Sequence, residues 1–174
     1  MASAGLSRIA RKLNEAEGYL MLEMPEHALR ILDSRDDWAT MRFEAGVLRG
    51  DALRMTGRFR EALQALEEAA RIRPNDESVA VMLGWCYKRT NQLAQAIDAL
   101  LPALRAHPSS SILHYNLACY WSLVGDVPKA VAYLSTAIRL DARFRAAVES
   151  EADFDGIRAE PAFVRLMDSP TRGI

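Results

Sequence analysis

Hydrophobic residues recur along the chain at spacings of three and four, the period of a helix with one buried face. These apolar runs come in pairs, and a short helix-breaking dipeptide separates the two members of each pair. The separators are Met24 with Pro25, Thr56 with Gly57, Thr90 with Asn91, and Gly125 with Asp126. Alternating runs of β-branched residues, which indicate strands, do not occur. The pattern therefore predicts an all-α chain built of helix pairs.

The helix pairs repeat every 34 residues, in blocks 9–42, 43–76, 77–110 and 111–144. Two positions hold the same amino acid in every block. The twentieth is Ala28, Ala62, Ala96 and Ala130, and the twenty-fourth is Leu32, Leu66, Leu100 and Leu134. The eighth position is always small: Ala16, Gly50, Gly84 and Ala118. The eleventh is always large: Tyr19, Leu53, Tyr87 and Trp121. Helices approach closely only where side chains are small, so these positions predict the contacts between paired helices.

This pattern resembles the tetratricopeptide repeat. Block three carries the resemblance most fully, with Leu83, Gly84, Tyr87, Ala96, Leu100, Ala103 and Pro108. Block one is the weakest copy, since it has Pro25 where an aromatic residue is usual and Thr40 where proline is usual. The resemblance covers residues 9–144. It implies a right-handed superhelix, an α-solenoid of four helix-turn-helix repeats, and we expect residues 1–174 to form one domain.

The segment 145–168 follows the last repeat and supplies four apolar anchors: Phe154, Ile157, Phe163 and Leu166. The last repeat of such an array has an open apolar face that must be covered. We therefore expect this segment to form a C-terminal cap.

Composition limits the kinds of partner and the cellular compartment that we expect for this chain. The net charge is −1, and 50% of the residues are hydrophobic. A basic surplus, which nucleic acids and anionic membranes require, is missing, so we expect neither as a partner. No signal peptide is expected, and no window approaches the roughly 18 apolar residues of a membrane span. Cys86 and Cys119 form no CxxC pair, which favours free thiols in the cytoplasm over a zinc site.

Candidate chemistry is sparse. Glu151, Asp153 and Asp155 are spaced like the start of a calcium loop, but Ala162 stands where a bidentate glutamate is needed. His114 and Cys119 are five apart on one predicted helix, so their side chains diverge and do not form a catalytic pair. Phosphate-binding and metalloprotease motifs are missing. We therefore predict no enzymatic activity, no cofactor and no metal.

The resemblance implies that the first helix of each repeat lines an inner groove. Positions two, five, nine and twelve of such a helix share one face. The groove residues predicted to bind a partner are Val47, Asp51, Arg54, Val81, Trp85, Lys88, Arg89, Tyr115, Asn116 and Cys119. Trp85 and Tyr115 are expected to be the anchors, because exposed aromatic side chains mark binding surfaces. The alternative is that these side chains pack on one another or on the protein's own first helix.

The sequence therefore predicts a non-enzymatic module that binds a peptide or amphipathic helix of a partner protein. Two alternatives stay open: a self-assembling structural scaffold and a small secretion chaperone of the same repeat type. The two-carboxylate clamp of co-chaperones is not expected, since only Asn116 matches its residue pattern.

Overall fold

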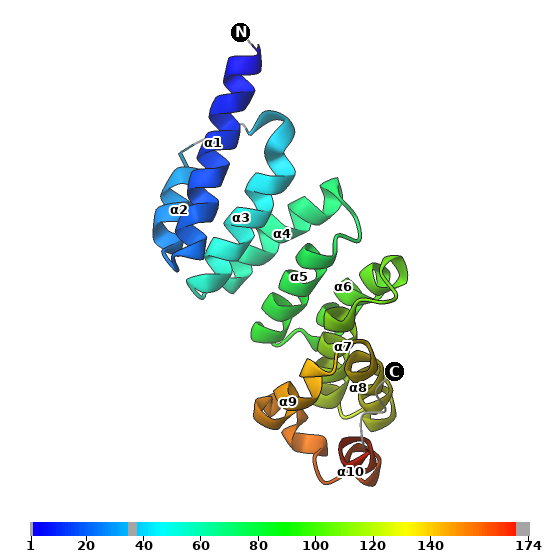
Figure 1. Ribbon diagram of the computed structural model, residues 1–174. Helices are drawn as coiled ribbons and strands as arrows, with labels where there is room; N and C mark the ends of the chain where they lie inside the picture. Colours follow the sequence, from blue (N-terminus) through cyan, green and yellow to red (C-terminus); the bar gives the residue numbers. More distant parts are fainter. Residues whose placement is uncertain (1, 35–37, 170–174) are drawn as a thin grey trace. The chain divides into compact units, whose positions relative to one another are not determined.

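The computed structural model describes residues 2–34 and 38–169, and it is helical in each repeat (Figure 1). Four helix pairs follow one another along the chain. The first helices of the pairs are α1 (Ala2–Met21), α3 (Arg42–Met55), α5 (Glu77–Arg89) and α7 (Ser111–Val124), and their partners are α2 (Pro25–Leu32), α4 (Phe59–Ile72), α6 (Leu93–Ala106) and α8 (Val127–Leu140). The remaining elements are η1 (Ala39–Met41), α9 (Arg143–Ser150), η2 (Ala152–Ile157) and α10 (Pro161–Asp168). No strand occurs in the described ranges, as the sequence predicts.

The 34-residue period is visible in the helix boundaries themselves. The helices α4, α6 and α8 begin at Phe59, Leu93 and Val127, and each start lies 34 residues after the one before. Glycine stands at two of the predicted turns because the backbone there has positive φ: 77° at Gly57 and 86° at Gly125. Between successive helix pairs, the side chains of Asp76 and Ser110 cap the N-termini of α5 and α7. They accept the backbone N–H groups of Val79 and Leu113.

The chain divides into two compact units, Met1–Thr90 and Asn91–Ile174, and each is described by itself. In the first unit, α2 packs between α1 and α3, and α4 packs between α3 and α5. The helices α1, α3 and α5 also contact one another in sequence order. The first helices of the repeats thus form one layer of this unit, and the second helices form the other.

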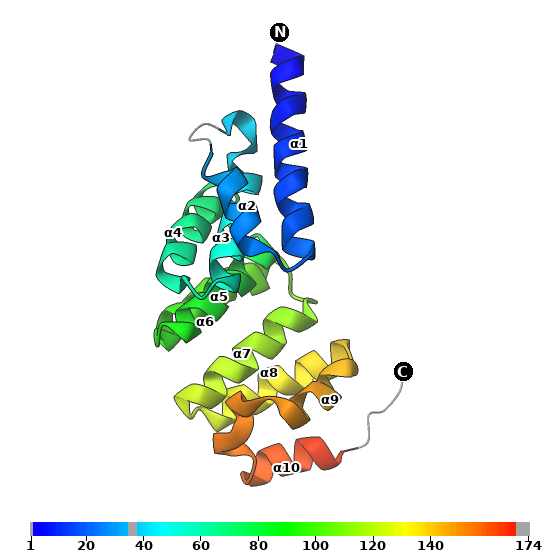
Figure 2. The same ribbon diagram turned by 90° about the vertical axis from the view of Figure 1, so that its left-hand side faces the viewer.

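The second unit ends in the predicted cap. α7 packs against α6 and α8, η2 lies on α7, and α9 and α10 lie on α8 (Figure 2). The anchors Phe154, Ile157 and Phe163 are buried, whereas Leu166 is half-buried. Arg145 ties the end of the cap to its beginning, because its guanidinium donates to the carbonyl oxygens of Leu166 and Met167.

The periodic alanines and leucines lie in the core. All four alanines of the twentieth position are fully buried, and the four leucines of the twenty-fourth are no more than 2% exposed. Gly50 shows why the eighth position must be small: a Cβ atom there would lie 2.5 Å from Cδ2 and Cγ of Leu66. The predicted close approach of the paired helices is confirmed at this contact.

Replacing Gly50 by alanine is therefore expected to lower the free energy of unfolding by about 1–3 kcal/mol, because Leu66 is enclosed and cannot move aside freely. Urea unfolding of the purified protein measures this. The matched control is Gly18→Ala, also within a helix, where no atom lies within 4 Å of the added Cβ. That control should gain about 0.5–1 kcal/mol from helix propensity. Equal effects of the two changes would contradict the packing explanation.

Candidate functional site

The face that the repeat pattern predicts for binding is formed in the first unit by α3 and α5. We call it the first-unit face and define it by Val47, Asp51, Arg54, Val81, Trp85, Lys88 and Arg89. The valines, Trp85 and Lys88 are half-buried, and Arg89 is exposed. Since α3 contacts α5, residues from consecutive repeats meet on this face.

Trp85 lies at the centre of an aromatic and cationic cluster. The Phe59 ring meets it edge-on, with 5.2 Å between ring centroids. The guanidinium of Arg54 lies 5.2 Å from the Trp85 ring centroid, and that of Arg89 lies 5.6 Å from it. Arg89 also lies 5.3 Å from the Phe59 ring. Cation–π attraction to the two guanidinium groups therefore helps to hold the Trp85 ring in place.

Asp51 orients Arg54. The carboxylate oxygen Oδ1 of Asp51 accepts hydrogen bonds from Nη2 of Arg54 at 2.6 Å and from Nε at 3.0 Å. Both side chains are about 30% exposed. The structure thus brings Asp51, Arg54, Trp85 and Arg89 together, as the shared helix face predicts.

Tyr115 and Cys119 in the second unit lie in a different environment. Tyr115 is only 8% exposed, because its ring stacks on Phe144 at 4.5 Å and meets Phe154 edge-on at 5.9 Å. Cys119 is 3% exposed, and the Ser122 hydroxyl donates to the carbonyl oxygen of Asp153 at 2.7 Å. Positions five, nine and twelve of α7 therefore hold the chain's own cap.

This finding differs from the expectation that Tyr115 is an exposed anchor and Cys119 a groove residue. The physical reason is that the open face of the last repeat is apolar, and the cap supplies the rings that cover it. Asn116 is also engaged internally: its amide donates to the carbonyl oxygen of Ile112 at 2.9 Å. These three residues are not part of the first-unit face.

A cavity beside Trp85 was not predicted from the sequence. It has a volume of about 390 Å³ and is lined by Gly57, Arg58, Phe59, Arg60, Glu61, Arg89 and Thr90. Arg58 pairs with Glu61 through two hydrogen bonds of 2.8 and 2.6 Å. The sequence signal that could have indicated this cavity is the run Arg58, Phe59 and Arg60 at the start of α4.

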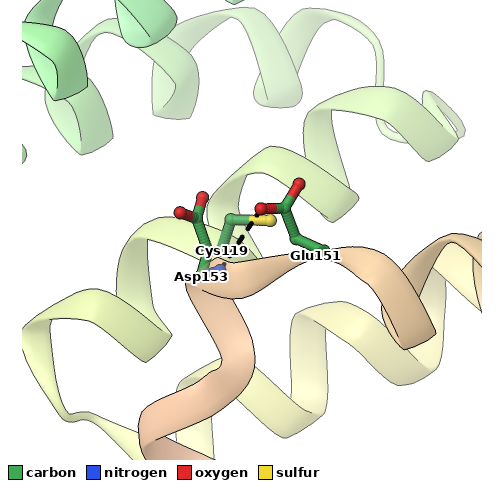
Figure 3. Close-up of side chains that lie close together, drawn as sticks. All are labelled: Cys119, Glu151 and Asp153. Carbon is green, nitrogen blue, oxygen red and sulfur yellow. Dashed lines mark hydrogen bonds between the residues drawn. The ribbon is translucent and has the colours of Figure 1, made fainter.

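Three side chains lie close enough together to hold a metal ion. One ligand atom each of Cys119, Glu151 and Asp153 lies within 4.8 Å of the others (Figure 3). The carboxylate of Glu151 also has a structural role, since its Oε1 accepts the N–H of Asp153 and starts η2. Asp155, the third residue of the calcium-like spacing, pairs with Arg158 instead. The observed arrangement is a capped turn over a buried thiol.

Cys86, His114 and Cys119 lie in different surroundings. Burial raises the pKa of the Cys86 thiol to about 11, which keeps it protonated near neutral pH. His114 lies against Tyr133, and its Nε2 is 3.1 Å from the carbonyl oxygen of Pro108. Cys119 lies against the cap instead. The predicted divergence of His114 and Cys119 is thus seen in their neighbours.

Stability should fall at alkaline pH. Burial raises the pKa of Cys86 from 9.0 to about 11, and burial with the hydrogen bond to Glu67 raises the pKa of Tyr87 from 10.0 to about 12. The folded chain holds these protons more tightly, so the unfolded chain ionises first as pH rises. The stabilisation is complete below about pH 9 and is lost towards pH 11 and 12. Urea unfolding across this range measures the decline, and Cys86→Ala should remove its first part; a flat profile would contradict it.

The two helix layers of the first unit and the capped last repeat of the second unit are typical of one class of protein, the α-solenoid. The model of the tetratricopeptide repeat family matches residues 53–118. One similar solved structure is MamA, with a TM-score of 0.72 and 20% sequence identity, covering 79% of this chain and 81% of that one. Another is MamA 41-end from Desulfovibrio magneticus RS-1, with a TM-score of 0.69 and 21% identity, covering 91% of this chain and 93% of that one. A third is YrrB, described as a TPR protein with an unusual peptide-binding site. Its TM-score is 0.71 and its identity 16%, and the match covers 90% of this chain and 81% of that one.

Residues 53–118 thus match the tetratricopeptide repeat, and the predicted solenoid fold is confirmed by its likeness to these structures. A comparison with curated proteins found no significant match. Among the described helices, none combines the length and the apolar character that crossing a membrane would demand.

Proposed function

We propose that the protein is a non-enzymatic interaction module that binds a peptide or amphipathic helix of a partner protein on the first-unit face. The observation that carries the proposal is the cluster around Trp85, where two aromatic rings and two arginines from α3, α4 and α5 meet at the surface. Tryptophan and arginine are the residues most enriched among those that dominate binding energy at interfaces.

The cap offers a precedent within the same chain. Positions five, nine and twelve of α7 hold a peptide segment by ring contacts and a hydrogen bond to its backbone. The equivalent positions of α3 and α5 form the first-unit face. A comparable mode of binding, with the segment supplied by another protein, is supported by this equivalence and by the peptide-binding description of the similar YrrB structure.

In this proposal Trp85 is the anchor, Val47 and Val81 form the apolar floor, and Arg54, Lys88 and Arg89 select charge. We also propose a cytoplasmic setting, because both cysteines are free thiols in buried positions. The proposal requires neither a cofactor nor a metal, and it involves no nucleic acid and no membrane.

Capture from a lysate of the source organism tests the proposal. The intact wild-type chain and the Trp85→Ala variant are used as baits side by side, and bound proteins are identified by mass spectrometry. A partner retained by the wild type and lost by the variant is the expected result. Identical captures would contradict a role for the first-unit face, and recovery of only the bait would favour self-assembly.

A further inference from the structure

The segment held by α7 has a definite chemistry. Residues 151–155 read Glu-Ala-Asp-Phe-Asp, so one aromatic residue is flanked by three carboxylates. The Phe154 side chain is fully buried and meets Tyr115, while Glu151 and Asp153 lie beside Cys119. An acidic segment with an aromatic anchor is therefore a ligand that this type of face accommodates.

The first-unit face is better suited to such a segment than α7 is. Where α7 has Cys119 and Ser122, α5 has Trp85 and Lys88, and α3 has Asp51 and Arg54. A ring of the ligand would find Trp85 and Phe59, which already prefer an edge-on contact with each other. The α5 and α3 positions thus combine an aromatic platform with two cations, of which Arg54 is paired with Asp51.

The cavity beside the platform adds positive charge. Three of its seven lining residues are arginines, and its one carboxylate, Glu61, is already paired with Arg58. Arg89 lies over the rings of Phe59 and Trp85, so its guanidinium connects the cavity to the platform. Arg60 is exposed at the same rim. An arginine excess beside aromatic rings favours carboxylates, because guanidinium groups pair with them in a planar, hydrogen-bonded geometry.

We propose that the partner segment is an acidic peptide with an aromatic residue, whose ring packs on Trp85 and Phe59 and whose carboxylates pair with Arg89 and Arg60. This inference rests on the proposed function and specifies the chemistry of the partner. The overall charge of −1 favours a local acidic segment over a nucleic acid, which would demand a broad basic surface.

A fluorescent peptide with the sequence of residues 150–157, Ser-Glu-Ala-Asp-Phe-Asp-Gly-Ile, is a suitable probe. Its binding to the intact chain is followed by fluorescence anisotropy. Two matched peptides separate the contributions: one has the three carboxylates replaced by amides, and one has alanine in place of phenylalanine. The chain's own cap keeps its advantage at α7, because a tethered segment has a high effective concentration.

We expect Trp85→Ala and Arg89→Glu each to weaken binding of the acidic peptide about tenfold or more. The control Arg71→Glu, at an exposed position of α4 outside the cavity, should leave the affinity unchanged, and the amide peptide should bind about tenfold more weakly than the acidic one. Binding should also weaken as salt is added.

Three outcomes would overturn the inference. If the amide peptide binds as tightly as the acidic one and both depend on Trp85, the acidic chemistry is wrong while the proposed function stands. If acidic-peptide binding is unaffected by both Trp85→Ala and Arg89→Glu, the peptide binds elsewhere. If inorganic phosphate displaces the peptide and the alanine peptide binds equally well, the cavity is a general anion site.

Discussion

Replacing Phe154 with alanine is expected to destabilise the second unit by about 3–5 kcal/mol. The side chain is fully buried, and its ring lies 5.9 Å from that of Tyr115 and 5.8 Å from that of Phe163. Its removal leaves a cavity between α7 and the cap that neighbouring rings cannot fill without moving. The lower stability should appear as faster hydrogen exchange in peptides of α7, α9 and α10, measured by mass spectrometry.

The matched control is Val164→Ala in the same cap. Val164 is 39% exposed, so its truncation should change exchange in these helices by less than about 1 kcal/mol. The helices α3 and α4 of the first unit serve as an internal reference. If Phe154→Ala and Val164→Ala were equally mild, the cap would not be a cooperative part of the second unit.

Replacing Trp85 with alanine is expected to weaken binding of the captured partner by 2 kcal/mol or more, about 30-fold in affinity. The change removes the ring that contacts Phe59 and lies beneath two guanidinium groups, so the arginines also lose their support. Isothermal titration calorimetry with the purified partner measures the difference, and circular dichroism confirms that the variant remains helical.

Two further variants test whether the loss of affinity is specific to the Trp85 ring. Trp85→Phe keeps an aromatic ring and should retain part of the affinity, since cation–π attraction is weaker for phenylalanine than for tryptophan. Ile72→Ala truncates an apolar side chain that is 48% exposed at the end of α4, and it should bind normally. Equal losses for Trp85→Ala and Ile72→Ala would show that the effect is not specific to the first-unit face.

The fold could be predicted from the sequence because its determinants are periodic. Ala62 and Leu66 recur at the same places in every block, and a contact between paired helices needs that combination of small and large side chains. A period of 34 residues without insertion leaves little freedom in where each helix begins. Helices α4, α6 and α8 therefore start at the expected spacing.

The candidate site could be predicted only in part. Residues on one helix, such as Trp85 and Arg89, are placed by helical geometry, and Arg54 joins them because the repeats stack regularly. The apolar anchors of the tail predict a cap on the last repeat, but helical spacing does not say which side chains of α7 the cap covers. The burial of Tyr115 by Phe144 and Phe154 was therefore not foreseen. Phe59 was also missed, since it belongs to the second helix of its repeat.

Site-specific photo-crosslinking shows directly whether the partner binds the first-unit face. A photoreactive amino acid replaces Val81 on the first-unit face or, as the control, Glu68 on the exposed surface of α4. We expect the partner to be crosslinked from position 81 and not from position 68, and Trp85→Ala to abolish the crosslink. Crosslinking from position 68 with none from position 81 would show that the partner does not bind the first-unit face.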